Sequence, residues 1–288
     1  MELAIGTAQF GLDYGVSNAT GRTPFTQVQS ILDRARLTGI DTLDTAAVYG
    51  DSEQVLGRIG VRNWRIVSKV PSLPEASVNG KDWVRNNLRQ SLDRLQVRRL
   101  DGLLLHSAID ILKPQGAEII AGLMEAKADG LVSKVGYSIY SPDLLPDLFR
   151  RMVPDLIQAP LNILDQRLVN SGWLTRLVDA GIEVHTRSAF LQGLLLMSKE
   201  CRPEYFARWD ELWQQWDAFV AAHGGSALAA CLSFVKAQPG VSRVVVGVEN
   251  PLHLEELLIA WEQAHILKTD AFACNDRHLI EPINWVMK

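Results

Sequence analysis

Short apolar runs alternate with segments of helical periodicity along the whole chain. Apolar positions recur every three to four residues in the intervening segments, such as TQVQSILDRARLTG and AEIIAGLMEAKADG, and Gly39, Gly130 and Gly181 lie where helix C-caps are expected. The apolar runs are LAIGTAQF, IDTLDT, WRIVSKV, LDGLLLHS, VSKVGYS, DLIQAPLN, GIEVHTRSAF and VSRVVVGVE. They contain too many apolar residues for strands that expose one face to water. Buried strands that alternate with helices predict a parallel sheet covered by helices. Eight such units in 288 residues predict a (β/α)8 barrel, the TIM-barrel class of α/β proteins.

The alternation also predicts the domain organisation. No linker-like or low-complexity stretch interrupts it, so residues 1–288 are expected to form one domain. A doubly wound sheet would use the same elements, but no GxGxxG follows the first strand, where that fold binds a dinucleotide, and no P-loop is found. The segment from Pro203 to Gln238 is long enough for two helices before the last strand, one more than the repeat requires.

Composition and charge narrow the classes of function. The chain is 47% hydrophobic and 22% charged, which is typical of a globular protein, and its net charge of -4 gives no reason to expect nucleic acid or an anionic membrane as partner. The start MELAIGTAQF has no signal-peptide pattern, and no segment has the roughly 18–20 apolar residues that span a bilayer. The three cysteines match no metal or disulfide spacing. We therefore expect a cytoplasmic protein without a bound metal.

Four side chains with acid–base chemistry lie at the ends of three consecutive predicted strands. Asp44 and Tyr49 follow the second strand, Lys69 lies in the third and His106 ends the fourth. Taken singly, each could be an ordinary rim or core residue, but the carboxyl ends of barrel strands are where active sites form. A phenol has a pKa of about 10 and donates its proton poorly at neutral pH. An ammonium beside the phenol oxygen stabilises the phenolate, a carboxylate holds the ammonium, and a histidine can orient a carbonyl oxygen. The group therefore predicts a general acid poised over a carbonyl.

These residues and their surroundings resemble the aldo-keto reductase family. The motifs GIDTLDTAAVYGDSEQVLG, IVSKV, LDGLLLHS, KADGLVSKVGYS, IQAPLNILD, RSAFLQGLL and VVVGVENPLHLEE follow one another in the family's order over nearly the whole chain. The resemblance implies a (β/α)8 barrel with a nicotinamide cofactor, usually NADPH, bound extended across its top. It also implies reversible reduction of a small-molecule aldehyde or ketone to an alcohol, with Tyr49 as the general acid.

The resemblance further implies a set of cofactor contacts. Ser138 and Gln158 are expected near the carboxamide, with Asn162 in the loop just beyond. The loop after the seventh strand is expected to cover the nicotinamide and the pyrophosphate with Arg187, Ser188, Phe190, Gln192 and Gly193. The loop and helix start after the eighth strand are expected to hold the adenosine end with Gly247, Glu249, His253 and Glu256.

Departures from the family pattern modify these expectations. Ile139 follows Ser138 where the family usually has asparagine, and Arg187 stands where many members stack an aromatic ring on the nicotinamide, a role that a planar guanidinium can also fill. Gly247 and His253 stand where basic residues often bind the 2′-phosphate, so we expect NADPH to be favoured only modestly over NADH. The hairpin that often plugs the bottom of the barrel does not precede the first strand, so the bottom must be closed in another way.

Two classes of function remain open. The chain can be a carbonyl reductase, or a non-catalytic nicotinamide-binding redox sensor or regulatory subunit. The complete acid–base set favours the enzyme, because a sensor does not need a tuned acid. A metal-dependent barrel hydrolase is disfavoured, because the strand ends lack an HxH motif and a carboxylate cluster. The substrate and the oligomeric state are not predicted.

Overall fold

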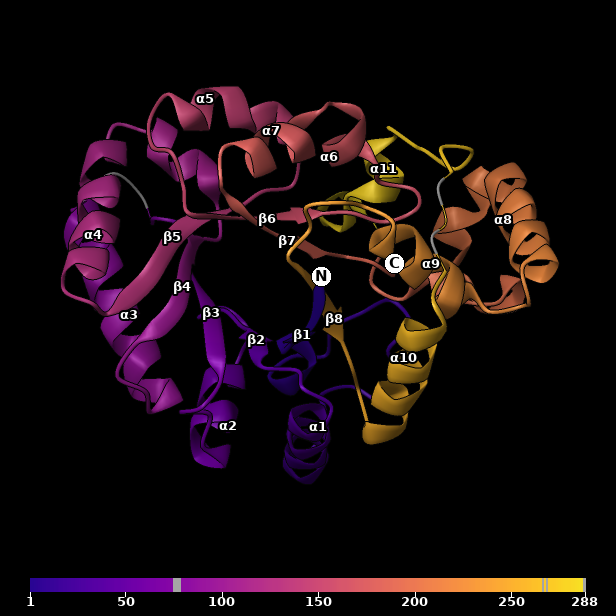
Figure 1. The fold of residues 1–288 in the computed structure, drawn as a ribbon, viewed down its shortest axis with the longest axis horizontal. Coiled ribbons are helices and arrows are strands. Elements are labelled where there is room, and N and C mark those ends of the chain that lie inside the picture. The colour runs from indigo at the N-terminus through magenta and orange to yellow at the C-terminus, as the bar shows by residue number, and fades with distance from the viewer. Residues whose placement is uncertain (75–78, 266, 268, 287–288) are drawn as a thin grey trace.

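The computed structural model describes residues 1–74, 79–265, 267 and 269–286. The remaining residues of the predicted 1–288 domain lie outside the described part. Parallel strands form a closed barrel in sequence order, and the last strand pairs back with the first (Figure 1). They are β1 (Glu2–Gly6), β2 (Thr42–Asp44), β3 (Arg65–Val70), β4 (Leu100–Leu105), β5 (Val132–Ser138), β6 (Leu156–Pro160), β7 (Glu183–Arg187) and β8 (Arg243–Gly247). The predicted (β/α)8 barrel is confirmed.

The helices surround the barrel on its outside (Figure 1). They are α1 (Phe25–Leu37), α2 (Ser52–Ile59), α3 (Gly80–Leu95), α4 (Gly116–Ala128), α5 (Leu145–Phe149), α6 (Arg167–Asn170), α7 (Trp173–Asp179), α8 (Asp210–Ala222), α9 (Ala227–Lys236), α10 (Pro251–Gln263) and α11 (Arg277–Ile280). Two helices, α8 and α9, separate β7 from β8, as predicted, and α8 lies farther from the barrel than α9 (Figure 1). Within the described residues, no single helix has the length and apolar content to cross a membrane. The segments Glu204–Ala222 and Ala227–Lys236 have that length and apolar content only when they are taken together, and they are bent by 90° relative to each other.

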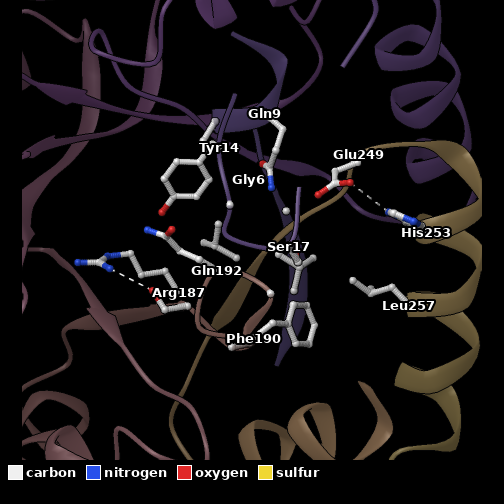
Figure 2. A pocket seen from close by; sticks show the side chains of 18 of the residues that line it. Gly6, Gln9, Tyr14, Ser17, Arg187, Phe190, Gln192, Glu249, His253 and Leu257 are labelled. Atoms are coloured by element: carbon white, nitrogen blue, oxygen red, sulfur yellow. Dashed lines mark hydrogen bonds and ion pairs between the residues drawn. The ribbon is translucent and has the colours of Figure 1, made fainter. Parts of the chain in front are cut away.

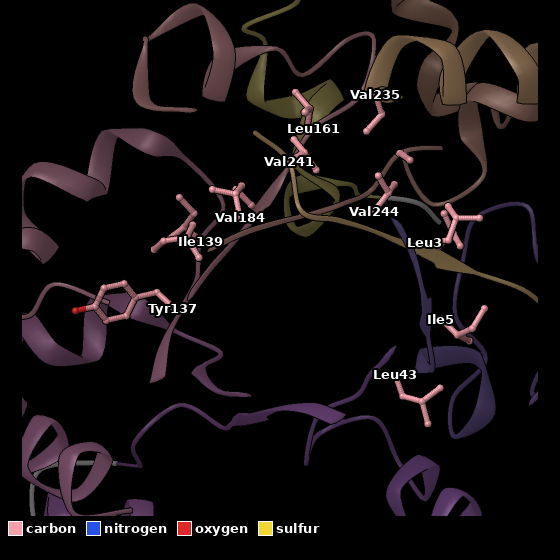
Figure 3. Packing of buried hydrophobic residues seen from close by; sticks show 14 of the residues in the cluster. Leu3, Ile5, Leu43, Tyr137, Ile139, Leu161, Val184, Val235, Val241 and Val244 are labelled. Atoms are coloured by element: carbon pink, nitrogen blue, oxygen red, sulfur yellow. The ribbon is translucent and has the colours of Figure 1, made fainter. Parts of the chain in front are cut away.

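Apolar side chains pack on both faces of the barrel wall, because successive residues of a strand point to opposite sides. A small cluster of Val67, Leu104 and Leu156 fills the middle of the barrel. A much larger cluster joins the outer face of the strands to the helices. Figure 3 shows some of its members: Leu3, Ile5, Leu43, Tyr137, Val184 and Val244. The apolar filling of the interior is confined to its middle, so polar side chains occupy both ends.

Charged side chains close the end of the barrel at which the strands begin. We call Glu2, Asp41, Arg65, Asp101, Lys134, Glu183 and Arg243 the basal network. Its ion pairs are Glu2–Arg243 at 3.0 Å, Arg243–Asp41 at 3.3 Å, Asp41–Arg65 at 3.9 Å, Arg65–Asp101 at 3.4 Å, Asp101–Lys134 at 3.3 Å and Lys134–Glu183 at 2.7 Å. Because each pair joins different strands or the residues just before them, the network ties the starts of the strands together across the bottom of the barrel.

Candidate active site

A pocket of about 380 Å³ lies at the opposite end of the barrel, where the strands end. One side of it is formed by Tyr14 and Arg187, and the other by the start of α10 with Glu249 and His253 (Figure 2). Tyr49 is also part of its lining. The other predicted residues in its lining are Asp44, Ser188, Phe190, Gln192, Gly193, Gly247 and Glu256. Most of the predicted site is therefore gathered in one elongated pocket.

Asp44 and Lys69 form a buried ion pair beneath this pocket. Lys69 Nζ lies 2.7 Å from Asp44 Oδ2, and the two side chains are only 1% and 6% exposed. The ammonium also donates to the Thr45 carbonyl at 2.9 Å, while Gln158 Nε2 donates to the other oxygen of Asp44 at 2.6 Å. Burial by itself lowers the pKa of Lys69, but the charge of Asp44 and its hydrogen bond outweigh it, so this pKa lies above its usual value. Lys69 therefore keeps its positive charge at neutral pH.

The Tyr49 phenol lies over this ammonium. Its oxygen is 3.5 Å from Lys69 Nζ, and the same nitrogen lies 5.1 Å from the centre of the ring. The first distance is long for a hydrogen bond, so the interaction is mainly electrostatic. The His106 ring meets the Tyr49 ring edge to face, with 5.8 Å between the ring centres. The structure thus brings together all four of the predicted acid–base residues.

His106 is held in its neutral form by its surroundings. Burial, followed by the positive charges of Lys69 and Arg187, lowers the pKa of His106 to about 4, although the charge of Asp44 acts in the opposite direction. A neutral imidazole carries one N–H group, which can donate a hydrogen bond to a carbonyl oxygen without carrying a charge. His106 can therefore orient a carbonyl group over the phenol at neutral pH.

Two glycines fix the loop that carries Tyr49. Gly50 adopts a φ of 56°, and a Cβ atom there would overlap the carbonyl of Gly11. A Cβ atom on Gly11 would in turn overlap the carbonyl of Tyr49. The loops after β1 and β2 thus pack backbone against backbone, and Ser52 adds a hydrogen bond to the Thr7 carbonyl at 2.9 Å. This packing fixes the backbone from which the phenol projects over Lys69.

Two neighbouring strands end in glycine at the floor of the pocket, so no side chain rises from the backbone at these two positions. Gly6 of β1 and Gly247 of β8 are paired in the barrel and both line the pocket. A Cβ atom on Gly247 would collide with the amide of Gln9. Glycine lets a ligand approach the backbone closely. A pocket with Tyr49 in its lining and two glycines in its floor, one of them beside the polar Gln9 amide, fits a dinucleotide such as a nicotinamide cofactor.

The loop after β7 covers this floor in a strained conformation. Ser188, Leu191 and Gln192 have φ values of 62°, 48° and 55°, which residues other than glycine rarely adopt and which concentrate at functional sites. The Val16 amide donates to the Gln192 carbonyl at 3.0 Å and so joins this loop to the loop after β1. The pocket is therefore bounded by two loops that hold each other in place.

The three residues expected near the carboxamide are engaged with other protein groups. Ser138 Oγ donates to Gln158 at 3.3 Å, and Gln158 in turn holds Asp44. Asn162 Nδ2 donates to the Ser188 carbonyl at 3.0 Å, and its side-chain oxygen accepts from the Leu164 amide at 2.9 Å. In these positions they support Asp44 and the loop after β7, and their contact with a cofactor stays a prediction.

The sequence predicted that the loop from Asp13 to Thr23 helps to shape the pocket, but the residues of β1 and of the segment after it were not among the predicted cofactor contacts. Gly6, Gln9, Tyr14 and Ser17 all line the pocket (Figure 2). The available signal was Gly6, a glycine inside the first apolar run as Gly247 is inside the last, and each of them ends its strand in the structure. The described residues contain no group of three or more His, Cys, Asp or Glu side chains that could hold a metal ion.

Comparison with known proteins gives one family over almost the whole chain. A sequence model described as "Aldo/keto reductase family" matches residues 2–279. The NADH-specific methylglyoxal reductase of Escherichia coli is 24% identical over 89% of this chain and 88% of its own length. The D-arabinose 1-dehydrogenase of Saccharomyces cerevisiae is 27% identical over 61% of this chain and 58% of its own length.

Solved structures agree with this family. A putative aldo-keto reductase from Pseudomonas aeruginosa superposes with a TM-score of 0.68 at 26% identity, over 91% of this chain and 90% of that one. An aldo-keto reductase from Bacillus halodurans in its holo form has the same fold, with a TM-score of 0.75 over 96% of this chain and 94% of that one, at 22% identity.

Proposed function

Since the chain belongs to the aldo/keto reductase family and is thus an oxidoreductase of carbonyl compounds, we propose that it reduces a small aldehyde or ketone with Tyr49 as the proton donor. The observation that carries this proposal is the placement of the Tyr49 hydroxyl 3.5 Å from the buried Lys69 ammonium at the edge of the pocket. The residues that line the pocket would hold a reduced nicotinamide cofactor, NADPH or NADH, which when bound would supply the hydride for the carbonyl carbon.

The side chains of this protein provide the proton and the positioning. Tyr49 donates its proton to the carbonyl oxygen, and the phenolate that remains is stabilised by Lys69. Asp44, held by Gln158, keeps the ammonium aimed at the phenol. The neutral imidazole of His106 orients the carbonyl oxygen by donating a hydrogen bond. The reverse reaction, oxidation of an alcohol, uses the same groups in the opposite order.

The test compares Tyr49→Phe with the unchanged protein in binding and in turnover. We expect the variant to bind the reduced cofactor normally, because the ring is kept, and to turn over about 10²–10⁴-fold more slowly, the usual contribution of a general acid. The carbonyl panel includes methylglyoxal, and D-arabinose with the oxidised cofactor tests the reverse direction, since these compounds name two of the relatives.

A second tyrosine provides the matched control. Tyr205→Phe also removes a phenol hydroxyl, one that donates to the His278 carbonyl at 3.0 Å, and Tyr205 does not line the pocket described above. This variant is expected to keep its full turnover. Unchanged turnover in Tyr49→Phe would remove Tyr49 from the mechanism. Cofactor binding by the unchanged protein without turnover of any carbonyl would instead favour the nicotinamide-binding sensor.

A further inference from the structure

The distribution of charge in the pocket bears on which dinucleotide it accepts. The proposed function places the nicotinamide beside Tyr49, so the adenosine end of an extended dinucleotide must lie at the start of α10. That side of the pocket is lined by Glu249 and His253 (Figure 2), and Glu256, which belongs to the same helix, is also in the lining. Among the described residues that line the pocket, Arg187 alone is an arginine or lysine, and it lies on the opposite side. The adenosine side therefore carries two carboxylates and no guanidinium or ammonium among these residues.

Arginines on neighbouring elements are engaged elsewhere. Arg34 of α1 donates to Glu255 at 2.9 Å, an ion pair between side chains that do not line the pocket. Arg243 begins β8, at the other end of the strand from Gly247, and is bound to Glu2 and Asp41 in the basal network. A 2′-phosphate, which carries about two negative charges and no useful donor, would find neither of these cations free.

Glu249 is placed to accept hydrogen bonds from a ligand. Its side chain is 18% exposed, and its closest cationic partner is His253 Nδ1 at 4.0 Å, beyond hydrogen-bond distance. No hydrogen-bond donor among the described residues reaches its oxygens. Burial raises the pKa of Glu249, although His253 acts against this. A half-buried carboxylate without donors is unfavourable unless a ligand supplies them, and two adjacent ribose hydroxyls are suitable donors.

The start of α10 offers little compensation to a phosphate. A helix N-terminus favours an anion through its free backbone amides. Here the Asn250 side chain already accepts from the His253 amide at 2.9 Å, so one of these donors is used. The two carboxylates beside it oppose a second negative group. The electrostatic balance on this side of the pocket is therefore against a 2′-phosphate.

We propose that the pocket selects NADH over NADPH, and that Glu249 is the residue that makes this selection by accepting hydrogen bonds from the 2′- and 3′-hydroxyls of the adenosine ribose. This inference rests on the proposed function for the orientation of the dinucleotide. It replaces the modest preference for NADPH expected from the family resemblance. NADPH lacks the 2′-hydroxyl that would donate to Glu249, and it places its 2′-phosphate next to this carboxylate. Both effects should weaken the binding of NADPH relative to NADH, by about 10–100-fold in total.

The test is a binding titration that needs no catalysis. The full-length protein is titrated with NADH, NADPH, ADP-ribose and the 2′-phosphate of ADP-ribose, followed by tryptophan fluorescence or calorimetry. The last two ligands lack nicotinamide and report on the adenosine side alone. Glu249→Gln keeps the shape and removes the charge, so we expect NADPH to gain about 10-fold in affinity while NADH loses a few-fold. The matched control is Glu262→Gln, which removes the same charge from the exposed far end of α10 and should leave the ratio unchanged.

Each outcome decides the inference. It is overturned if the unchanged protein binds NADPH as tightly as NADH, if Glu249→Gln shifts the ratio no more than Glu262→Gln, or if neither dinucleotide binds. Selective binding of NADH that is lost in Glu249→Gln supports it, even when no carbonyl in the panel is turned over. In that case the proposed reductase activity fails and the assignment of Glu249 stands, so the two failures are distinguishable.

Discussion

His106 is expected to stay uncharged throughout the pH range in which the protein works. An ordinary histidine, with a pKa of 6.5, is substantially protonated at pH 6, whereas the pKa of His106 is lowered to about 4. A protonated imidazole would add a third positive charge to a site that already holds Lys69 and Arg187. Because His106 is neutral, it does not compete with the Tyr49 phenol as the acid that protonates the carbonyl oxygen.

The free-energy cost of protonating His106 follows from its lowered pKa. The difference between 6.5 and about 4 is about 2.5 pH units, and at about 1.4 kcal/mol per unit this disfavours the charged ring by about 3 kcal/mol. At pH 6 the protonated fraction of His106 should be about 1%, against about 75% for an unperturbed histidine. The contrast is large enough to measure directly.

The assay is an NMR titration of the imidazole nitrogens between pH 8 and pH 4.5. The His106 signals are assigned by their absence from the spectrum of a His106→Gln variant. We expect these signals to keep the neutral pattern down to about pH 5. The value of kcat/KM for reduction should, over the same range, show no fall that depends on His106.

A second variant tests the cause of the shift. Arg187→Gln removes one of the two positive charges, so the pKa of His106 should rise, while burial and Lys69 keep it below 6.5. Arg62→Gln removes a charge from an exposed residue before β3, at the other end of the strand from the pocket, and should leave the titration unchanged. Titration of His106 near pH 6.5 in the unchanged protein would refute the reasoning.

Two further predictions concern stability. The hydrogen bond between His185 and Glu183, with help from Lys134 and against the effect of burial, lowers the pKa of Glu183 to about 2, below its usual value of 4.5. This carboxylate therefore stabilises the fold fully above about pH 4.5 and loses its effect as the pH falls toward 2, so Glu183→Gln should cost about 1–3 kcal/mol at pH 7 and progressively less in acid. Urea unfolding at both pH values measures this, and a constant difference would contradict it. Gly193→Ala should cost about 1–2 kcal/mol, because Gly193 has a φ of 89° and a Cβ atom there overlaps Ser17. A Gly193→Ala/Ser17→Gly double variant should recover the part of this lost stability that comes from the overlap with Ser17, but not the part that comes from the positive φ. If the double variant recovers no stability, the overlap is excluded as a cause.

The barrel and its acid–base residues could be predicted because both depend on local patterns. Each apolar run predicted its own strand, and strands of a parallel barrel all end on the same side, so Asp44, Lys69 and His106 had to lie near one another. The extra helix before β8 was predicted from segment length alone. None of these steps needed knowledge of which strand lies beside which.

The remaining features depend on distant parts of the chain. Gln158 holds Asp44 across the barrel interior, and the pocket uses the segment after β1 because barrel closure brings Gly6 next to Gly247. The left-handed residues of the loop after β7 include Gln192, whose identity does not signal a positive φ. Sequence patterns describe neighbours along the chain, whereas these contacts arise only when the barrel closes.

The basal network has a consequence for how the barrel folds correctly. A strand that slips by two residues still points its apolar side chains to the same face, so the apolar pattern alone does not detect that error. The basal network is sensitive to such a slip. On β3, Arg65 and Lys69 are four residues apart on the same face of the strand, and on β7 the same holds for Glu183 and Arg187. A slipped strand would break ion pairs at the bottom and push a charge toward the apolar middle. The ion pairs at the bottom of the barrel thereby disfavour misaligned strands, and this fixes the alignment of the side chains at the end where the pocket lies.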